Sequence, residues 1–107
     1  GSLDLGGMQK RIRSYVQARN EGRIPGVDGA LKPEASQILF QAFIQGALER
    51  STALEMTGAS ESRTARRLIK QLKDDGLLSE TSSRSPLKWE IPEHAEPYYF
   101  PQLAPGI

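Results

Sequence analysis

Apolar side chains recur with a helical period near the start of the chain. Their spacing predicts a helix from about Met8 to Asn20, with one apolar face made of Met8, Ile12, Tyr15 and Val16. Glycine and proline are frequent in residues 21–31, which predicts a loop there. We therefore expect a connecting helix in residues 3–20, separated by this loop from the rest of the chain.

Two further helices are predicted between the loop and the middle of the chain. Pro33 and Glu34 suit a first helical turn, because proline lacks the N–H that is unpaired there and an acid stabilises the positive end of the helix dipole. The apolar run that follows ends at Gly46 and consists of Ala35, Ile38, Leu39, Ala42 and Phe43. A shorter helix of about Ser51–Met56 then stops at Thr57-Gly58.

The next segment is the most strongly amphipathic one. Ser60 is a favourable N-cap residue with Glu61 just inside the first turn, and Asp74-Asp75-Gly76 ends the helix. At about 100° per residue, one face is apolar and consists of Ala65, Leu68, Ile69 and Leu72. Arg63, Arg67 and Lys70 lie roughly opposite that face, with Arg66 on the flank.

After Gly76 the pattern changes from a helical to an alternating one. Leu87, Trp89 and Ile91 alternate with Lys88 and Glu90, which is typical of a half-buried strand. Together with Leu77-Leu78 and the Ser-rich stretch between, this predicts a β-hairpin. Residues 92–107 are predicted to be an irregular, docked tail, with His94 as a surface residue.

The order of these elements indicates the fold class. A short helix, a three-residue turn with Gly58, a capped basic helix and a hairpin form a winged helix-turn-helix, a mainly α fold with a small β-hairpin. We expect this domain in residues 32–91, with a recognition helix at about 60–75 and a wing at about 77–91. Its predicted core residues are Leu54, Ala65, Leu68, Ile69, Leu72, Leu77 and Trp89.

Composition excludes several kinds of site. The chain has 107 residues, no cysteine and a single histidine, which excludes disulfides, Cys-ligated zinc and two-histidine metal sites. We expect no metal, no cofactor and no catalytic residue. No apolar run reaches the roughly 18–20 residues that span a bilayer, so we expect no membrane contact and a cytoplasmic location. Gly1-Ser2 is typical of a cloning scar.

Charge is concentrated in one segment. The net charge is only +1, yet residues 60–73 hold five basic side chains and one acid. A basic helix that exposes its cations fits the major groove of duplex DNA. The candidate DNA-binding residues are Ser62, Arg63, Arg66, Arg67 and Lys70 on the recognition helix, and Arg84 and Lys88 on the wing.

An alternative remains open at this point. Any amphipathic surface helix has a charged outer face, and many winged helices contact proteins instead of DNA. In that case the apolar face of the first helix would be the contact surface, either for another domain or for a second copy in a homodimer.

Two phrases of the sequence carry a resemblance to a known family. Ser-Glu-Ser-Arg-Thr-Ala-Arg-Arg at 60–67 and Leu-Lys-Asp-Asp-Gly-Leu-Leu at 72–78 resemble the recognition-helix region of the C-terminal winged-helix domain of Fic (filamentation induced by cAMP) proteins. Ser85-Pro86-Leu87 resembles the wing of that domain, and residues 98–105 resemble its closing Phe-Pro phrase. Upstream, residues 3–16 resemble the helix that connects it to the catalytic domain. Pro97 departs from the pattern, since it would interrupt a short terminal helix.

The resemblance also implies what this chain lacks. Fic proteins transfer AMP from ATP to target hydroxyls with a loop of the form His-Pro-Phe-x-x-Gly-Asn-Gly-Arg, and that loop is not in the sequence. The resemblance therefore implies a non-catalytic regulatory domain of a bacterial Fic protein and not an enzyme. Its expected partners are duplex DNA, the Fic catalytic domain of the same chain, or a second copy.

Overall fold

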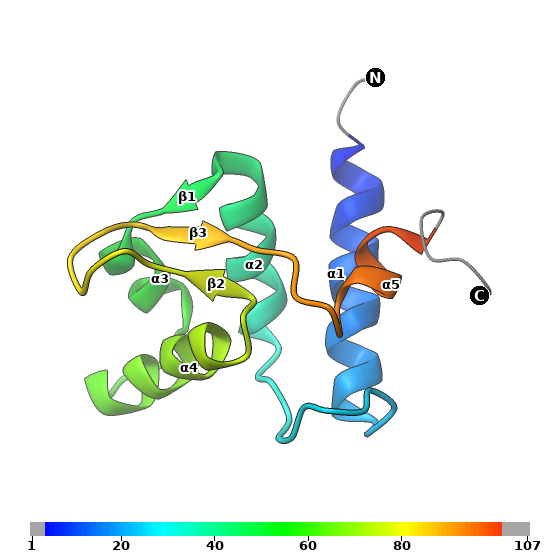
Figure 1. Ribbon diagram of the computed structural model, residues 1–107. Coiled ribbons are helices and arrows are strands. Elements are labelled where there is room, and N and C mark those ends of the chain that lie inside the picture. Colours follow the sequence, from blue (N-terminus) through cyan, green and yellow to red (C-terminus); the bar gives the residue numbers. More distant parts are fainter. Residues whose placement is uncertain (1–3, 102–107) are drawn as a thin grey trace.

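Five helices and a small three-stranded antiparallel sheet make up the part of the chain that the computed structural model describes, residues 4–101 (Figure 1). In chain order the elements are α1 (Leu5–Asn20), α2 (Glu34–Gln45), β1 (Ala47–Leu48), α3 (Arg50–Met56), α4 (Ser62–Asp74), β2 (Leu78–Ser79), β3 (Leu87–Trp89) and α5 (Glu96–Tyr99). The predicted mainly α class with a hairpin is confirmed. The expectations for residues 1–3 and 102–107 lie outside the described residues.

Helix α1 begins a few residues earlier than the apolar pattern indicates. The side chain of Asp4 caps it by accepting a hydrogen bond of 2.9 Å from the Gly7 N–H. A Cβ atom at Gly7 would lie 2.1 Å from the Asp4 carboxylate, so a larger residue there would make the Asp4 side chain shift. No helix in the described part of the chain is long and apolar enough to cross a membrane.

The apolar face of α1 is buried within its own chain. Met8, Ile12, Tyr15 and Val16 are each at most 6% exposed, and α1 packs against α2 and α5 (Figure 1). This face is therefore covered by the chain's own elements and is not the exposed contact surface that the protein-contact alternative expected. A face that is hydrophobic because it contacts the rest of its own domain has the same sequence pattern as one that contacts another protein.

The sheet contains one strand more than the sequence pattern predicts. Strand β3 pairs with β2, which is the predicted hairpin, and also with β1, giving the order β1-β3-β2. Strand β1 directly follows Gly46, whose φ of +79° turns the chain out of α2. Two residues are too few to produce a recognisable alternation, so the pattern could not indicate β1.

The predicted core is largely confirmed. Ala65, Leu68, Ile69, Leu72 and Leu77 are buried, whereas Leu54 and Trp89 are only partly buried. The Trp89 ring packs edge-on against Phe43, with 4.9 Å between centroids, and stacks on Tyr99 at 5.2 Å. Ile91 is 44% exposed, contrary to its place in the alternating pattern, because β3 ends at Trp89.

The segment after the sheet is more regular than predicted. Residues 96–99 form the short helix α5 despite Pro97, because proline in a first turn loses no helical hydrogen bond. Tyr99 is fully buried, and the Arg11 Nε–H of α1 donates to its carbonyl oxygen at 2.7 Å. Helix α5 thus packs against α1.

Candidate nucleic-acid interface

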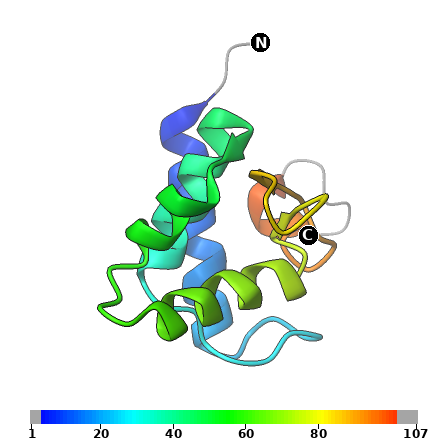
Figure 2. The ribbon, with the colours of Figure 1, turned by 90° about the vertical axis from the view of Figure 1, so that its left-hand side faces the viewer.

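Helix α4 has one buried and one exposed face, as its sequence pattern predicts. Ala65, Leu68, Ile69 and Leu72 are at most 4% exposed. The candidate DNA-binding residues of this helix are all exposed, namely Ser62, Arg63, Arg66, Arg67 and Lys70. Figure 2 shows α4 lying along the outside of the molecule, with its whole length open on one side.

The start of α4 differs from the prediction. The helix begins at Ser62, and Glu61 occupies the N-cap position without making a side-chain hydrogen bond to the helix. Ser60 is therefore not the cap. The turn from α3, residues 57–61, is longer than three residues. Thr57 stabilises its first part: its hydroxyl donates to the Leu54 carbonyl at 2.7 Å and accepts from the Ala59 N–H at 3.3 Å.

The cations of α4 differ in whether an acid neutralises them. Lys70 forms an exposed ion pair with Asp74, with Nζ and Oδ2 2.7 Å apart. The hydrogen bond to Asp74 and its charge raise the pKa of Lys70. Within residues 4–101, no acid forms an ion pair with Arg63, Arg66 or Arg67. The unneutralised positive charge therefore belongs to the N-terminal half of the helix.

The two hairpin candidates, Arg84 and Lys88, are also exposed. The loop that carries Arg84 is held by Ser85, whose hydroxyl accepts from the Thr81 and Ser82 N–H groups and donates to the Ser82 carbonyl. Lys88 lies on the central strand β3, opposite Ser79 and Ala47. The hairpin loop and α4 lie on the same side of the molecule, away from α1 and α5 (Figure 1).

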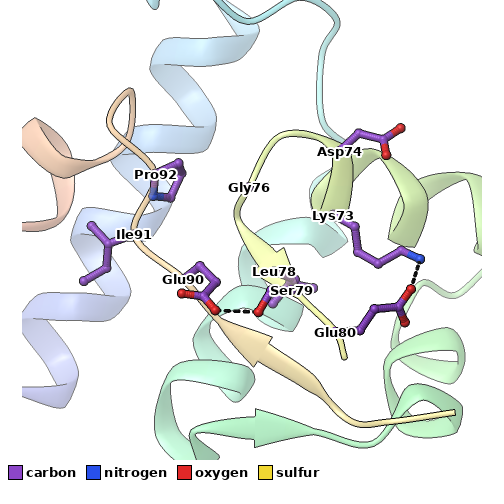
Figure 3. A pocket seen from close by; sticks show the side chains of 9 residues that line it. All are labelled: Lys73, Asp74, Gly76, Leu78, Ser79, Glu80, Glu90, Ile91 and Pro92. Atoms are coloured by element: carbon purple, nitrogen blue, oxygen red, sulfur yellow. Dashed lines mark hydrogen bonds and ion pairs between the residues drawn. The ribbon is translucent and has the colours of Figure 1, made fainter. Parts of the chain in front are cut away.

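An ion cluster at the base of the hairpin has no counterpart in the sequence analysis. Glu80 pairs with Arg50 of α3 and with Lys73 of α4, whose Nζ lies 2.6 Å from Glu80 Oε1. Lys73 and Glu80 line an open groove of about 620 Å³, where Ser79 also donates to Glu90 (Figure 3). Glu80 carries one negative charge against the two positive charges of Arg50 and Lys73, so it offsets only part of their charge and the cluster keeps a net charge of +1. Nothing in the spacing of these three residues indicated the cluster.

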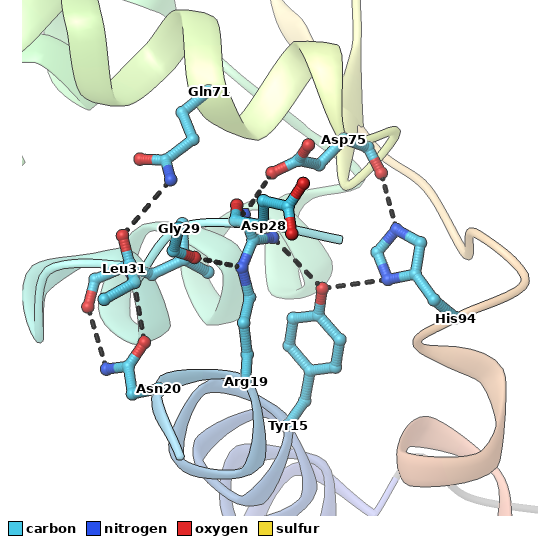
Figure 4. A network of polar contacts seen from close by, with 10 residues as sticks. Tyr15, Arg19, Asn20, Asp28, Gly29, Leu31, Gln71, Asp75 and His94 are labelled. Carbon is cyan, nitrogen blue, oxygen red and sulfur yellow. Dashed lines mark hydrogen bonds and ion pairs between the residues drawn. The ribbon is translucent and has the colours of Figure 1, made fainter. Parts of the chain in front are cut away.

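A second polar network fixes the C-terminal end of α4 (Figure 4). The Arg19 side chain is only 1% exposed and pairs with Asp75, the residue that follows α4. It also donates to the carbonyls of Asp28 and Gly29 at 3.0 and 2.9 Å. Every nitrogen of the guanidinium thus has a hydrogen-bond partner, which offsets the free-energy cost of burying the charge. Burial lowers the pKa of Arg19, but the hydrogen bonds to Asp75 and Tyr15 outweigh it and leave the pKa raised.

His94 belongs to this network and is not the surface residue that was predicted. It is half-buried, its Nε2 lies 2.8 Å from the Asp75 carbonyl, and its Nδ1 lies 2.9 Å from the Tyr15 hydroxyl. A carbonyl can only accept, so Nε2–H donates to it and, in the neutral ring, Nδ1 accepts from Tyr15. The hydrogen-bonded network therefore links α1, the start of the tail and the end of α4. Its members in order of contact are Arg19, Tyr15, His94 and Asp75.

Within residues 4–101, no group of three or more His, Cys, Asp or Glu side chains is arranged to hold a metal ion. The carboxylates of Glu80 and Glu90 in the open groove are engaged by neighbouring side chains. The exposed arginines of α4, which form no ion pair within residues 4–101, are free to contact a polyanion.

Comparisons of the chain with protein-family models, with curated proteins and with solved structures found no match.

Proposed function

We propose that residues 32–91 form a winged helix-turn-helix. Helices α3 and α4 with the turn between them correspond to the helix-turn-helix, and the β2–β3 hairpin corresponds to the wing. The element order and the outward position of α4 support this assignment. In such a fold the second helix of the pair enters the major groove.

We further propose that the domain binds duplex DNA through α4. The observation that carries this proposal is that Arg63, Arg66 and Arg67 are exposed and without an acidic partner in the described chain, on a helix whose opposite face is buried. An α-helix with its side chains is about 10–12 Å wide, which matches a major groove of about 12 Å. Duplex DNA is the polyanion whose shape fits this helix.

The candidate residues divide into two roles. Ser62 and Arg63 lie in the first turn of α4, and residues near that end of a recognition helix contact base edges. Arg66, Arg67 and Lys70 follow along the helix, where Lys70 must first leave Asp74. Arg84 and Lys88 on the hairpin would contact phosphates, which position a protein on the duplex without reading its sequence.

We also propose that the chain is the non-catalytic, regulatory region of a bacterial Fic protein. The phrases at 60–67 and 72–78 support this, and they coincide with α4 and its C-terminal end. A DNA-binding role requires access to the chromosome, so we propose a cytoplasmic location. The surface predicted for the protein-contact alternative is not exposed, since the apolar face of α1 is buried in its own domain.

A fluorescence-anisotropy titration tests the DNA-binding proposal. We expect the protein to bind a labelled duplex of mixed sequence with a Kd of about 10⁻⁴–10⁻⁶ M. If about four to six phosphates are neutralised, log K should fall with log salt with a slope of about −4 to −5. No binding at low salt contradicts the proposal.

Two substitutions distinguish the proposed interface from nonspecific attraction. Arg63→Ala should lower the affinity for a preferred site by about 1–3 kcal/mol if Arg63 contacts a guanine. Arg13→Ala, which removes an exposed arginine from α1, is the matched control and should leave binding nearly unchanged. Equal effects of the two substitutions contradict a role for α4.

A further inference from the structure

The loop between α1 and α2 runs along one flank of α4 (Figure 2). Gln71 of α4 holds it there by donating to the Ala30 carbonyl at 3.2 Å. The loop and the helix enclose a shallow groove of about 250 Å³. Its lining residues are Ala30, Lys32, Thr64, Arg67, Leu68 and Gln71.

Lys32 is the one lysine among these lining residues, and it lies far from α4 in the sequence. Its side chain is exposed, and no acid in the described part of the chain pairs with it. It therefore adds an unneutralised positive charge beside Arg67. This charge lies next to the N-terminal half of α4, which holds the arginines that form no ion pair.

The backbone around Lys32 is fixed although it belongs to a loop. The preceding residue, Leu31, is 2% exposed, and the Asn20 side chain bonds both its N–H at 2.8 Å and its carbonyl at 2.9 Å. The Lys32 carbonyl accepts from the Ala35 N–H at the start of α2. Lys32 is thus presented from a rigid position, which lowers the entropic cost of placing its ammonium group on a ligand.

The two ends of this flank of α4 also differ in the charged residues that line them. Toward the C-terminal end of α4 the neighbouring groove contains the acids Asp28, Asp74 and Asp75 together with the cations Arg67 and Lys70. The groove at Lys32 contains no acid. A phosphate group on this side of α4 is therefore more favourable beside Lys32, where cations line the groove without acids, than beside Asp28, where three acids oppose two cations.

The width of an α-helix relative to the major groove indicates which part of the DNA would lie beside this flank of α4. When a helix of about 10–12 Å fills a groove of about 12 Å, its two flanks face the two sugar-phosphate walls. Arg66 lines the α3 side of α4, and Thr64 and Gln71 line the loop side. Lys32 thus extends the loop-side flank toward one wall.

We propose that Lys32 is a phosphate-binding residue of this interface, outside both α4 and the hairpin. Its ammonium group contacts a backbone phosphate on the strand that borders the loop-side flank, next to Thr64 and Arg67. This inference rests on the proposed DNA-binding function. It assigns the α1–α2 loop to the interface, which the sequence analysis treated only as a connection.

The test compares Lys32→Gln, Lys32→Arg and the control Lys10→Gln, which removes an exposed lysine of α1. Each protein is titrated onto a labelled mixed-sequence duplex at several salt concentrations, after circular dichroism has shown equal folding. We expect Lys32→Gln to weaken binding about tenfold near 50 mM salt and to make the log–log salt slope shallower by about one unit. Lys32→Arg and Lys10→Gln should keep the wild-type slope.

The outcomes separate this inference from the function on which it rests. If the wild-type protein binds no duplex at low salt, both fail together. If the wild type binds and Lys32→Gln has the wild-type slope, the assignment of Lys32 is overturned while DNA binding stands. A loss in Lys10→Gln equal to that in Lys32→Gln also overturns it, because the effect would then follow net charge and not position.

Discussion

Two fully buried tyrosines differ in what their hydroxyl groups contact. The Tyr15 hydroxyl lies 2.9 Å from His94 Nδ1 and accepts a hydrogen bond from Arg19 Nη1 at 3.3 Å. The Tyr99 hydroxyl has no hydrogen-bond partner among the described residues. A buried polar group without a partner costs about 1–3 kcal/mol of stability, whereas a paired one contributes. The same residue type therefore has opposite effects at these two positions.

This contrast predicts opposite outcomes for one substitution. Tyr99→Phe should leave the free energy of unfolding unchanged or raise it by about 1 kcal/mol, because it removes an unpaired hydroxyl and keeps the ring. Tyr15→Phe should lower it by about 1–3 kcal/mol, because it leaves Arg19 Nη1 and His94 Nδ1 each without a hydrogen-bond partner. Urea denaturation measures both. A larger loss for Tyr99→Phe than for Tyr15→Phe would contradict the assignment.

The same two hydroxyls predict sensitivity to alkali. Burial raises the pKa of Tyr15 above its usual value of 10.0, although Arg19 opposes the shift, and burial raises the pKa of Tyr99 further. Above pH about 10 the unfolded chain releases these protons and the folded chain retains them, so stability falls as pH rises. This contribution is fully present below pH about 10.

Denaturation midpoints at pH about 9 and about 11 test this prediction. The wild type should lose stability between the two values, and Tyr99→Phe should lose less, because one of the two shifted groups is gone. An identical loss in both proteins would show that the fall comes from other groups.

Residue roles were predictable from the sequence only where local periodicity sets them. The outward positions of Arg63, Arg67 and Lys70 follow from the helical period of their own segment. Arg19 and His94 gave no such signal, because their partners lie in other elements: Arg19 and Asp75 are 56 positions apart. A charged residue on a helix is expected to be exposed unless the fold brings an ion-pair or hydrogen-bond partner to it from another element. The periodicity of its own helix contains no information about such a partner.

At the scale of single elements, the end of α4 depends on a glycine. Gly76 has φ = +76°, and a Cβ atom there would lie 3.3 Å from Pro92 Cβ. This glycine turns the chain directly from the helix into β2, and so determines where the hairpin lies relative to α4. Other residue types adopt this backbone conformation only with strain.

Gly76→Ala should therefore lower the free energy of unfolding by about 1–2 kcal/mol. Gly6→Ala is the matched control: Gly6 lies inside α1, and nothing is within 4 Å of the added Cβ atom. That change should raise stability by about 0.5–1 kcal/mol, because alanine is favoured over glycine in a helix. Thermal unfolding of both variants decides the matter, and equal shifts of Tm would contradict the role given to Gly76.

The helices of seven residues or more and the β2–β3 hairpin were predictable, whereas β1 and α5 were not. Helices α2 and α3 lie within about a residue of their predicted bounds because each has several apolar positions and a glycine near its end. Strand β1 and helix α5 have two and four residues, which is too short for either periodicity. They form because β3 and α1 provide their hydrogen bonds and buried contacts, which are properties of the assembled fold.

For the whole molecule, the burial of the α1 face determines the expected oligomeric state. The large apolar side chains with most exposure among the described residues are Leu5, Ile44 and Ile91, and each is at least 56% covered by its own chain, at 41%, 43% and 44% exposure. We expect sedimentation velocity to give one species with the coefficient of a single chain, independent of concentration. A dimer at micromolar concentration would contradict this and would require another contact surface.

The short strands at the two edges of the sheet have a consequence for aggregation. In the order β1-β3-β2 the longest strand is central, and each edge strand has only two residues. An edge strand exposes unpaired N–H and C=O groups that can recruit a strand from another molecule, and short edges offer too few of them for stable pairing. The fold thus protects its sheet against amyloid-like growth by keeping its edges short, and a substitution that lengthened β1 or β2 would weaken that protection.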